Sequence, residues 1–192
     1  MLNNILPFPK TEPEVKFNIH EPGTLYTLAT HLRLFMQDFA AKEHTLVVLC
    51  IGTDRSTGDA LGPLTGSKLR TFNSYPHIYG TLDEPVHATN LVDTLSTIQG
   101  SISNPFIVEV DACLGRLENV GFVSIGKGPL RPGSAVNKNL PPVGHAYING
   151  IVNVSGFMEH FVLQSTRLNL VMKMADTIAH SLSYSIRNLG TP

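Results

Sequence analysis

The sequence has no surplus of charge of either sign and no long apolar run. Fourteen basic and fifteen acidic residues leave a formal net charge of −1, without a basic block of the kind that binds nucleic acid or an anionic membrane. No apolar stretch approaches the roughly 20 residues needed to cross a bilayer. Residues 1–17 also lack the basic and then apolar order of a secretory signal. These absences predict a cytoplasmic protein that binds neither nucleic acid nor membrane.

Cysteine is also scarce, and several common catalytic motifs are missing. Cys50 and Cys113 lie within or just after apolar, strand-like runs, so we expect buried free thiols rather than a disulfide or a nucleophile. The chain contains no G-x-S-x-G elbow, no P-loop and no G-x-G-x-x-G fingerprint. The motifs of serine hydrolases of that type and of nucleotide-binding folds are therefore absent.

The sequence does contain an alternation of strand-like and helix-like segments. At 192 residues and 42% hydrophobic residues, it can bury one sizeable core. Strands are predicted at 45–50, 77–82, 105–112 and 120–130, a strand or loop at 145–155, and helices at 22–41, 59–72, 90–100 and, as one or two helices, 156–187. A long loop is predicted at 126–145. The alternation predicts an α/β fold with a mostly parallel sheet between helix layers. Residues 1–21 are predicted to form an N-terminal arm and residues 22–192 a single domain.

Aspartates follow two of the predicted strands. Asp54 and Asp59 lie in the loop "IGTDRSTGDALGP" after the strand at 45–50, and Asp111 ends the strand at 105–112. Because ligands bind beyond the carboxyl ends of parallel strands, we expect Asp59 and Asp111 to share one cleft. Asp54 is expected to support its loop by accepting backbone N–H groups. The structural alternatives are a helix N-cap for Asp59 and a turn-holding role for Asp111.

Two carboxylates in one dry cleft cannot both ionise cheaply. One keeps a proton, which provides an acid and a base for attack of water on an amide. With a histidine, the same pair would instead offer ligands to a divalent metal. The spacing of the residues does not separate these two chemistries.

Two motifs resemble a known protease family. The loop "GTDRSTGDALGP" resembles that of the germination protease, the endopeptidase that degrades small acid-soluble spore proteins, and "VEVDACLGR" is similar to its second aspartate motif. A looser third motif is "SIGKGPLRPGSAV", and the resemblance runs from about residue 45 to 153. The chain is also similar to a short sporulation protein family of Bacillus-like spore formers and, more weakly, to the hydrogenase maturation peptidases. The resemblance implies a three-layer, phosphorylase/hydrolase-like sandwich in which Asp59 and Asp111 are the essential aspartates.

The remaining candidates are supporting residues. The hydrogenase maturation peptidases bind the nickel of their substrate with a histidine as third ligand, and His87 and His145 are the candidates for that position. Arg116 is a candidate for orienting a carboxylate or a peptide carbonyl. Asp54 completes this supporting set, and we expect no resident metal or other cofactor.

These observations together predict an endopeptidase that uses an aspartate pair. Its substrates would be spore proteins, such as the small acid-soluble spore proteins, during sporulation or germination in the forespore or spore core. Self-association into a homo-oligomer is compatible with this reading. Two alternatives stay open: a non-catalytic sporulation protein that binds a peptide or partner in the same cleft, and a nickel-sensing peptidase like the hydrogenase maturation enzymes.

Overall fold

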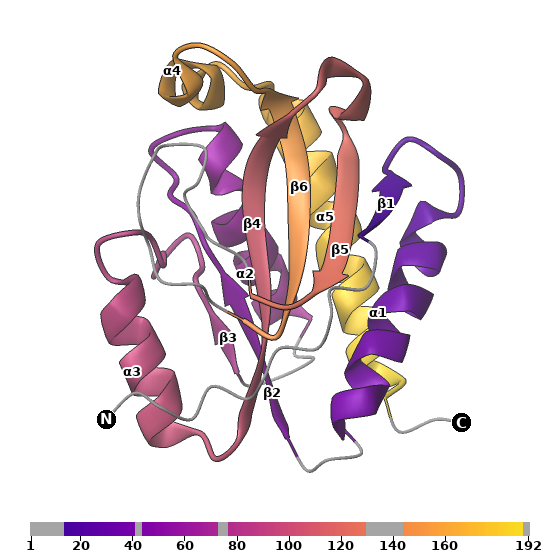
Figure 1. Cartoon of the computed structure of the whole chain (residues 1–192), viewed down its shortest axis with the longest axis vertical. Coiled ribbons are helices and arrows are strands. Elements are labelled where there is room, and N and C mark those ends of the chain that lie inside the picture. Colours follow the sequence, from indigo (N-terminus) through magenta and orange to yellow (C-terminus); the bar gives the residue numbers. More distant parts are fainter. Residues whose placement is uncertain (1–13, 41–43, 73–76, 130–143, 190–192) are drawn as a thin grey trace.

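One six-stranded sheet organises the protein. The computed structural model describes residues 14–40, 44–72, 77–129 and 144–189. The strands follow the order β1-β5-β6-β4-β2-β3 (Figure 1). They are β1 (Val15–Asn18), β2 (Thr45–Cys50), β3 (Ile78–Tyr79), β4 (Pro105–Gly115), β5 (Phe122–Lys127) and β6 (Ala146–Val154). The pairs β6–β4, β4–β2 and β2–β3 are parallel, whereas β1–β5 and β5–β6 are antiparallel.

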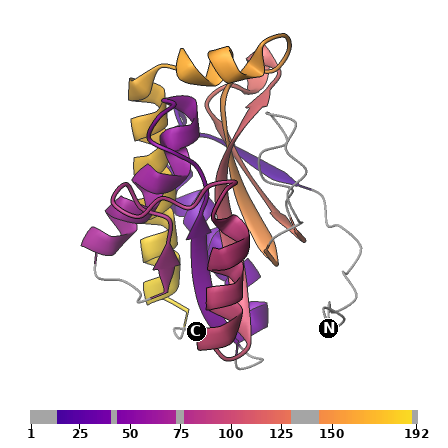
Figure 2. The ribbon, with the colours of Figure 1, turned by 90° about the vertical axis from the view of Figure 1, so that its left-hand side faces the viewer.

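Helices cover both faces of the sheet. The helices α1 (Thr24–Ala40), α2 (Leu61–Thr71) and α5 (Leu168–Arg187) contribute to the larger core cluster on one face, and α3 (Leu91–Ser101) contributes to a second cluster on the other. Figure 2, turned by 90°, shows the sheet between these layers. The predicted single-domain, three-layer α/β fold with a mostly parallel sheet is confirmed.

The sequence of β2 explains why it lies inside the sheet. Its run "TLVVLC" is apolar at consecutive positions, and side chains alternate between the two faces of a strand. Val48 and Cys50 accordingly pack into the larger core cluster, whereas Val47 and Leu49 pack into the smaller one. A run that is apolar on both faces therefore forms a strand covered on both sides, as expected for a parallel sheet.

The structure differs from the sequence-based predictions at the N-terminal end of the described chain. Residues 15–18 fall within the predicted N-terminal arm, yet they form β1, which pairs with β5 and adds an edge strand. The segment predicted at 156–187 as one helix or two contains two helices, α4 (Glu159–Gln164) and α5, in agreement with the second option. Of the long loop predicted at 126–145, which includes much of the third motif, residues 130–143 lie outside the described residues. Within the described ranges, no helix has both the length and the apolar character needed to span a membrane.

Candidate functional site

Backbone hydrogen bonds fold the loop after β2 back against the sheet. The Gly52 N–H donates to the Val86 carbonyl oxygen (2.8 Å), and the Thr53 N–H donates to the Asp59 carbonyl oxygen (3.1 Å). Gly52 has a φ of +143°, and a Cβ at this position would lie 2.0 Å from the same Asp59 oxygen. Only glycine permits this approach, which holds the backbone of Asp59 close to the end of β2.

Asp59 lies in η1 (Gly58–Ala60), a short 3-10 helix that leads directly into α2. The N-cap residues are Thr57 for η1 and Ala60 for α2, and neither makes a side-chain capping bond. Asp59 therefore does not occupy the N-cap position that the structural alternative assigned to it. It is half-buried, and η1 packs against both β4 and α4. The side-chain Nδ2 of Asn153, near the end of β6, donates to the Val162 carbonyl oxygen (3.2 Å) and so ties α4 to the sheet.

Asp111 is buried on β4, next to the point where β2 leaves the sheet. The Ile51 N–H donates to the Val110 carbonyl oxygen (2.8 Å), after which Gly52 begins the loop that contains Asp59. The prediction that this strand ends at Asp111 is wrong, because pairing with β6 carries β4 on to Gly115. On the side of β2, however, Asp111 lies at the carboxyl edge of the sheet.

A buried polar stripe runs from Asp111 across the neighbouring strands. Asp111 is in register with Asn149 of β6, and Asn149 is in register with Ser124 of β5. All three residues are buried, and we call them the polar stripe. Asp111 Oδ1 accepts from the Ala112 N–H (2.7 Å), whereas Asn149 Oδ1 is buried with no hydrogen-bond partner in the described part of the chain. An unsatisfied buried acceptor of this kind is uncommon and marks a place for a water or a ligand group.

Glu109 is a second buried carboxyl on β4 that the sequence analysis missed. Its side chain is fully buried, and neither carboxyl oxygen has a hydrogen-bond partner among the described residues. Burial raises the pKa of Glu109 well above its usual range, and the nearby Asp111 raises it further. The available signal was the alternation in "VEVD", which places both acidic side chains on the same face of a strand.

Asp54 and Arg116 lie at the surface of this edge. Asp54 is exposed and has no recorded partner within the described ranges, and its turn is held instead by Thr53 Oγ1, which accepts from the Arg55 N–H (3.3 Å). The expected support of the loop by Asp54 is therefore supplied by the preceding threonine. Arg116 is exposed just beyond β4 and forms an ion pair with Glu118 (3.9 Å).

The two candidate histidines occupy different places. His87 directly follows Val86, which forms a β-bridge with Ile51. The Nδ1 of His87 lies 2.9 Å from Thr89 Oγ1. His145 Nδ1 accepts from the Ile107 N–H (3.1 Å). Ile107 precedes Asp111 by four residues, or about 13 Å along a strand. The structure thus brings His87 next to the aspartate loop and keeps His145 away from Asp111.

The cysteines do not provide an activated nucleophile. Both thiols are free, and Cys50 is buried. Burial raises the pKa of Cys113 to about 12, with a further contribution from Asp111, so its thiol stays protonated at neutral pH. In the described ranges, no three His, Cys, Asp or Glu side chains form a group that could hold a metal ion.

Exposed apolar side chains lie on α4 or just before it. Phe157, Met158 and Phe161 have 91%, 53% and 58% of their surface exposed. They precede or belong to α4, which packs against η1 and lies at the top of Figure 1. Apolar side chains grouped in this way provide a surface on which a polypeptide could bind.

Comparisons with known proteins identify relatives of the chain and of its fold. A family model described as "Protein of unknown function (DUF1256)" matches residues 16–181. YyaC of Bacillus subtilis (strain 168), an uncharacterized protein, is 59% identical over 143 residues, which cover 74% of this chain and 70% of YyaC. Among solved structures, the [NiFe] hydrogenase maturation protease HycI from Thermococcus kodakarensis KOD1 has a similar fold, with a TM-score of 0.54 and 17% identity, over 80% of this chain and 99% of that chain. The expected likeness to hydrogenase maturation peptidases is confirmed for the fold, and the resemblance to the germination protease stays a prediction.

Proposed function

We propose that this chain, which belongs to the DUF1256 family, is an endopeptidase whose Asp59 and Asp111 act on a peptide bond. One carboxylate takes a proton from water, and the water oxygen bonds to the carbonyl carbon of the substrate. The C–N bond breaks as the second, protonated carboxyl donates its proton to the leaving amine. Both residues are catalytic in this proposal because both exchange protons with the reacting groups.

One observation carries the proposal: Asp111 is buried where β2 ends, beside the loop whose backbone closes on Asp59. The packing of η1 against β4 supports a common cleft for the two carboxyls. A buried position also supports acid–base chemistry, because exclusion of water strengthens the electrostatic coupling between neighbouring carboxyls. The similarity to HycI, a protease, is compatible with a peptidase, but it concerns the fold alone.

The proposed substrates are spore proteins, in particular the small acid-soluble spore proteins of the forespore or spore core. The resemblance of "GTDRSTGDALGP" and "VEVDACLGR" to the germination protease motifs supports this choice. The exposed Phe157 and Phe161 beside η1 also favour a polypeptide over a small molecule, because they can bind apolar side chains next to the cleft.

The proposal is tested by digestion of purified small acid-soluble spore proteins, with fragments identified by mass spectrometry. The natural chain should cleave them, and Asp111→Asn should lose cleavage while its melting temperature changes little. The matched control is Asp93→Asn, which changes an exposed aspartate on α3 in the same way and should cleave normally. The proposal fails if the natural chain leaves the substrates intact, which favours a protein that only binds a partner, or if Asp111→Asn cleaves at the natural rate.

A further inference from the structure

A cleft lies at the outer edge of β3, next to the aspartate loop. It has a volume of about 380 Å³ and is lined by residues of α2, β3, the loop after β3 and the first turn of α3, among them Arg70, Tyr79, Glu84, His87 and Asn90. One lining residue, Val86, bridges to Ile51 and accepts the Gly52 N–H (2.8 Å). The cleft is therefore joined through the backbone to the loop that contains Asp59.

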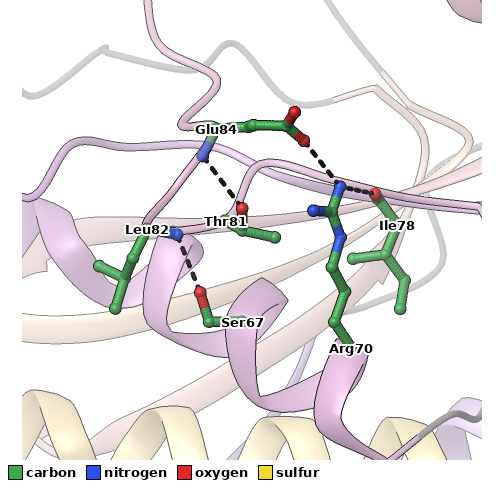
Figure 3. Close-up of polar contacts among 6 residues, drawn as sticks. All are labelled: Ser67, Arg70, Ile78, Thr81, Leu82 and Glu84. Carbon is green, nitrogen blue, oxygen red and sulfur yellow. Dashed lines mark hydrogen bonds and ion pairs between the residues drawn. The ribbon is translucent and has the colours of Figure 1, made fainter.

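Arg70 is the cationic group of this cleft. It extends from the last turn of α2, and its Nη2 donates to the Ile78 carbonyl oxygen (3.3 Å) and to Glu84 Oε2 (3.1 Å), as Figure 3 shows. Its Nη1 and Nε have no hydrogen-bond acceptor among the described residues. The bond to Ile78 fixes the position of the guanidinium and leaves the N–H groups of Nη1 and Nε available to a ligand.

The loop that carries Glu84 is held in place by its own hydrogen bonds. The Glu84 N–H donates to Thr81 Oγ1 (3.1 Å), and the Leu82 N–H donates to Ser67 Oγ of α2 (2.8 Å; Figure 3). Gly80 has a φ of +84°, and a Cβ there would lie 1.8 Å from the Cys50 carbonyl oxygen, so the loop leaves β3 in a conformation that favours glycine. The wall of the cleft is thus preformed, which lowers the entropic cost of binding.

The ion pair between Arg70 and Glu84 can be replaced by a pair between Arg70 and a ligand carboxylate at little cost in stability. Their side chains are 46% and 73% exposed, and exposed pairs of this kind contribute only about 0–1 kcal/mol to stability. Guanidinium groups bind carboxylates in a two-point geometry through Nη2 together with Nη1 or Nε, so a ligand carboxylate would take the place of Glu84 on Nη2. His87 also lines the cleft, and its Nε2 has no recorded partner among the described residues.

We propose that this cleft binds a carboxylate of the polypeptide substrate through Arg70, and that Glu84 occupies the guanidinium when the cleft is empty. The carboxylate belongs to an acidic side chain or to the C-terminus of the polypeptide. The identification of a polypeptide rests on the proposed function, whereas the carboxylate site itself rests on the geometry of the cleft.

Three synthetic N-acetylated alanine hexapeptides test the site, titrated into the 15N-labelled full chain carrying Asp111→Asn so that cleavage does not interfere. One peptide has an internal glutamate and an amidated end, one an internal glutamine and an amidated end, and one the glutamine and a free C-terminal carboxylate. We expect the amide signals of Gly80 and His87 to shift with at least one carboxylate peptide and not with the neutral one. Which carboxylate peptide binds identifies the source of the group.

The variants give opposite predictions. Arg70→Met removes the guanidinium and keeps the length of the side chain, and it should weaken binding about tenfold or more, as loss of a charge-assisted hydrogen bond does. Glu84→Gln removes the competing carboxylate and should tighten binding several-fold. The control is Arg187→Met, because Arg187 Nη2 also donates to a backbone carbonyl, that of Phe72 (3.1 Å), and Arg187 does not line the cleft.

The inference is overturned if the neutral peptide binds as well as the others, or if Arg70→Met binds like Arg187→Met while melting curves show all variants folded. The two proposals fail separately. If peptide binding depends on Arg70 but spore proteins are not cleaved, the carboxylate site is supported and the peptidase proposal fails. If Arg70→Met changes neither peptide binding nor cleavage of spore proteins, the peptidase proposal is supported and the carboxylate site fails.

Discussion

Glu109 and Asp111 lie two residues apart on the same face of β4, and both are buried. The Asp111 carboxyl accepts the neighbouring Ala112 N–H (2.7 Å), whereas neither oxygen of Glu109 has a partner among the described residues. Two carboxyls so placed compete for ionisation, and the one without partners is the one that keeps its proton. A protonated Glu109 therefore adds no negative charge next to the candidate catalytic aspartate.

Replacing Glu109 by glutamine should make the protein more stable at high pH. The folded-state pKa of Glu109 is raised above its ordinary value of 4.5, so above that pH the unfolded chain loses a proton that the folded chain keeps. The free energy of unfolding then falls by about 1.4 kcal/mol per pH unit until Glu109 ionises in the folded protein. Urea unfolding measured at pH 5 to 9 should give Glu109→Gln a larger free energy of unfolding than the natural chain, and the difference should grow with pH. Glu118→Gln, at the surface, is the control and should follow the natural chain.

His145 should produce the opposite pH dependence. Burial, aided by the nearby His44, lowers the pKa of His145 below its ordinary value of 6.5, so the unfolded chain binds a proton first as the pH falls. As the pH falls below 6.5, the free energy of unfolding of the natural chain should decrease by up to about 1.4 kcal/mol per pH unit. His145→Gln keeps an acceptor for the Ile107 N–H and should abolish this loss of stability at low pH. His160→Gln changes an exposed histidine of α4 and should lose stability as the natural chain does. Parallel slopes for all three proteins would contradict the prediction.

Gly52→Ala should destabilise the aspartate loop. The new Cβ would lie 2.0 Å from the Asp59 carbonyl oxygen at a φ of +143°, so the loop must move or strain. We expect a loss of about 2 kcal/mol or more in the free energy of unfolding, together with slower cleavage. Gly100→Ala is a matched control because, apart from the backbone of its own helix, no described atom lies within 4 Å of its Cβ position on α3, and it should stabilise by about 0.5–1 kcal/mol. A Gly52→Ala protein as stable as the natural chain would show that the loop is not constrained.

Spore-protein cleavage should not depend on a resident metal. An aspartate pair that shares one proton works between its two apparent pKa values, so the rate should be bell-shaped in pH and unchanged by a chelator. A metal site would instead need ionised carboxylates and would strengthen as pH rises. Elemental analysis after gel filtration, with assays before and after chelation, decides between them. Near one equivalent of nickel or zinc, lost together with activity, would favour the nickel-sensing alternative.

The sequence by itself determined the local elements and the fold class. The run "TLVVLC" is apolar from Leu46 to Cys50, and a short apolar run of this kind is typical of a strand covered on both faces. Leu28 and Leu32 recur at helical spacing and form part of the buried side of α1. Helix and strand periodicities arise between residues a few positions apart, so they can be read without knowledge of the rest of the chain.

The tertiary structure alone decided which side chains surround Asp111. The loop with Asp59 reaches the edge because β2 stops at Cys50, whereas β4 continues because β6 pairs with it. Asn149 stands beside Asp111 only through the register of those two strands, and only the placement of the surrounding strands and helices shows that Glu109 has no partner among the described residues. The cleft of Arg70 likewise joins α2, β3 and α3. Strand order, register and the partners of buried polar groups depend on contacts between distant segments, which local periodicity does not encode.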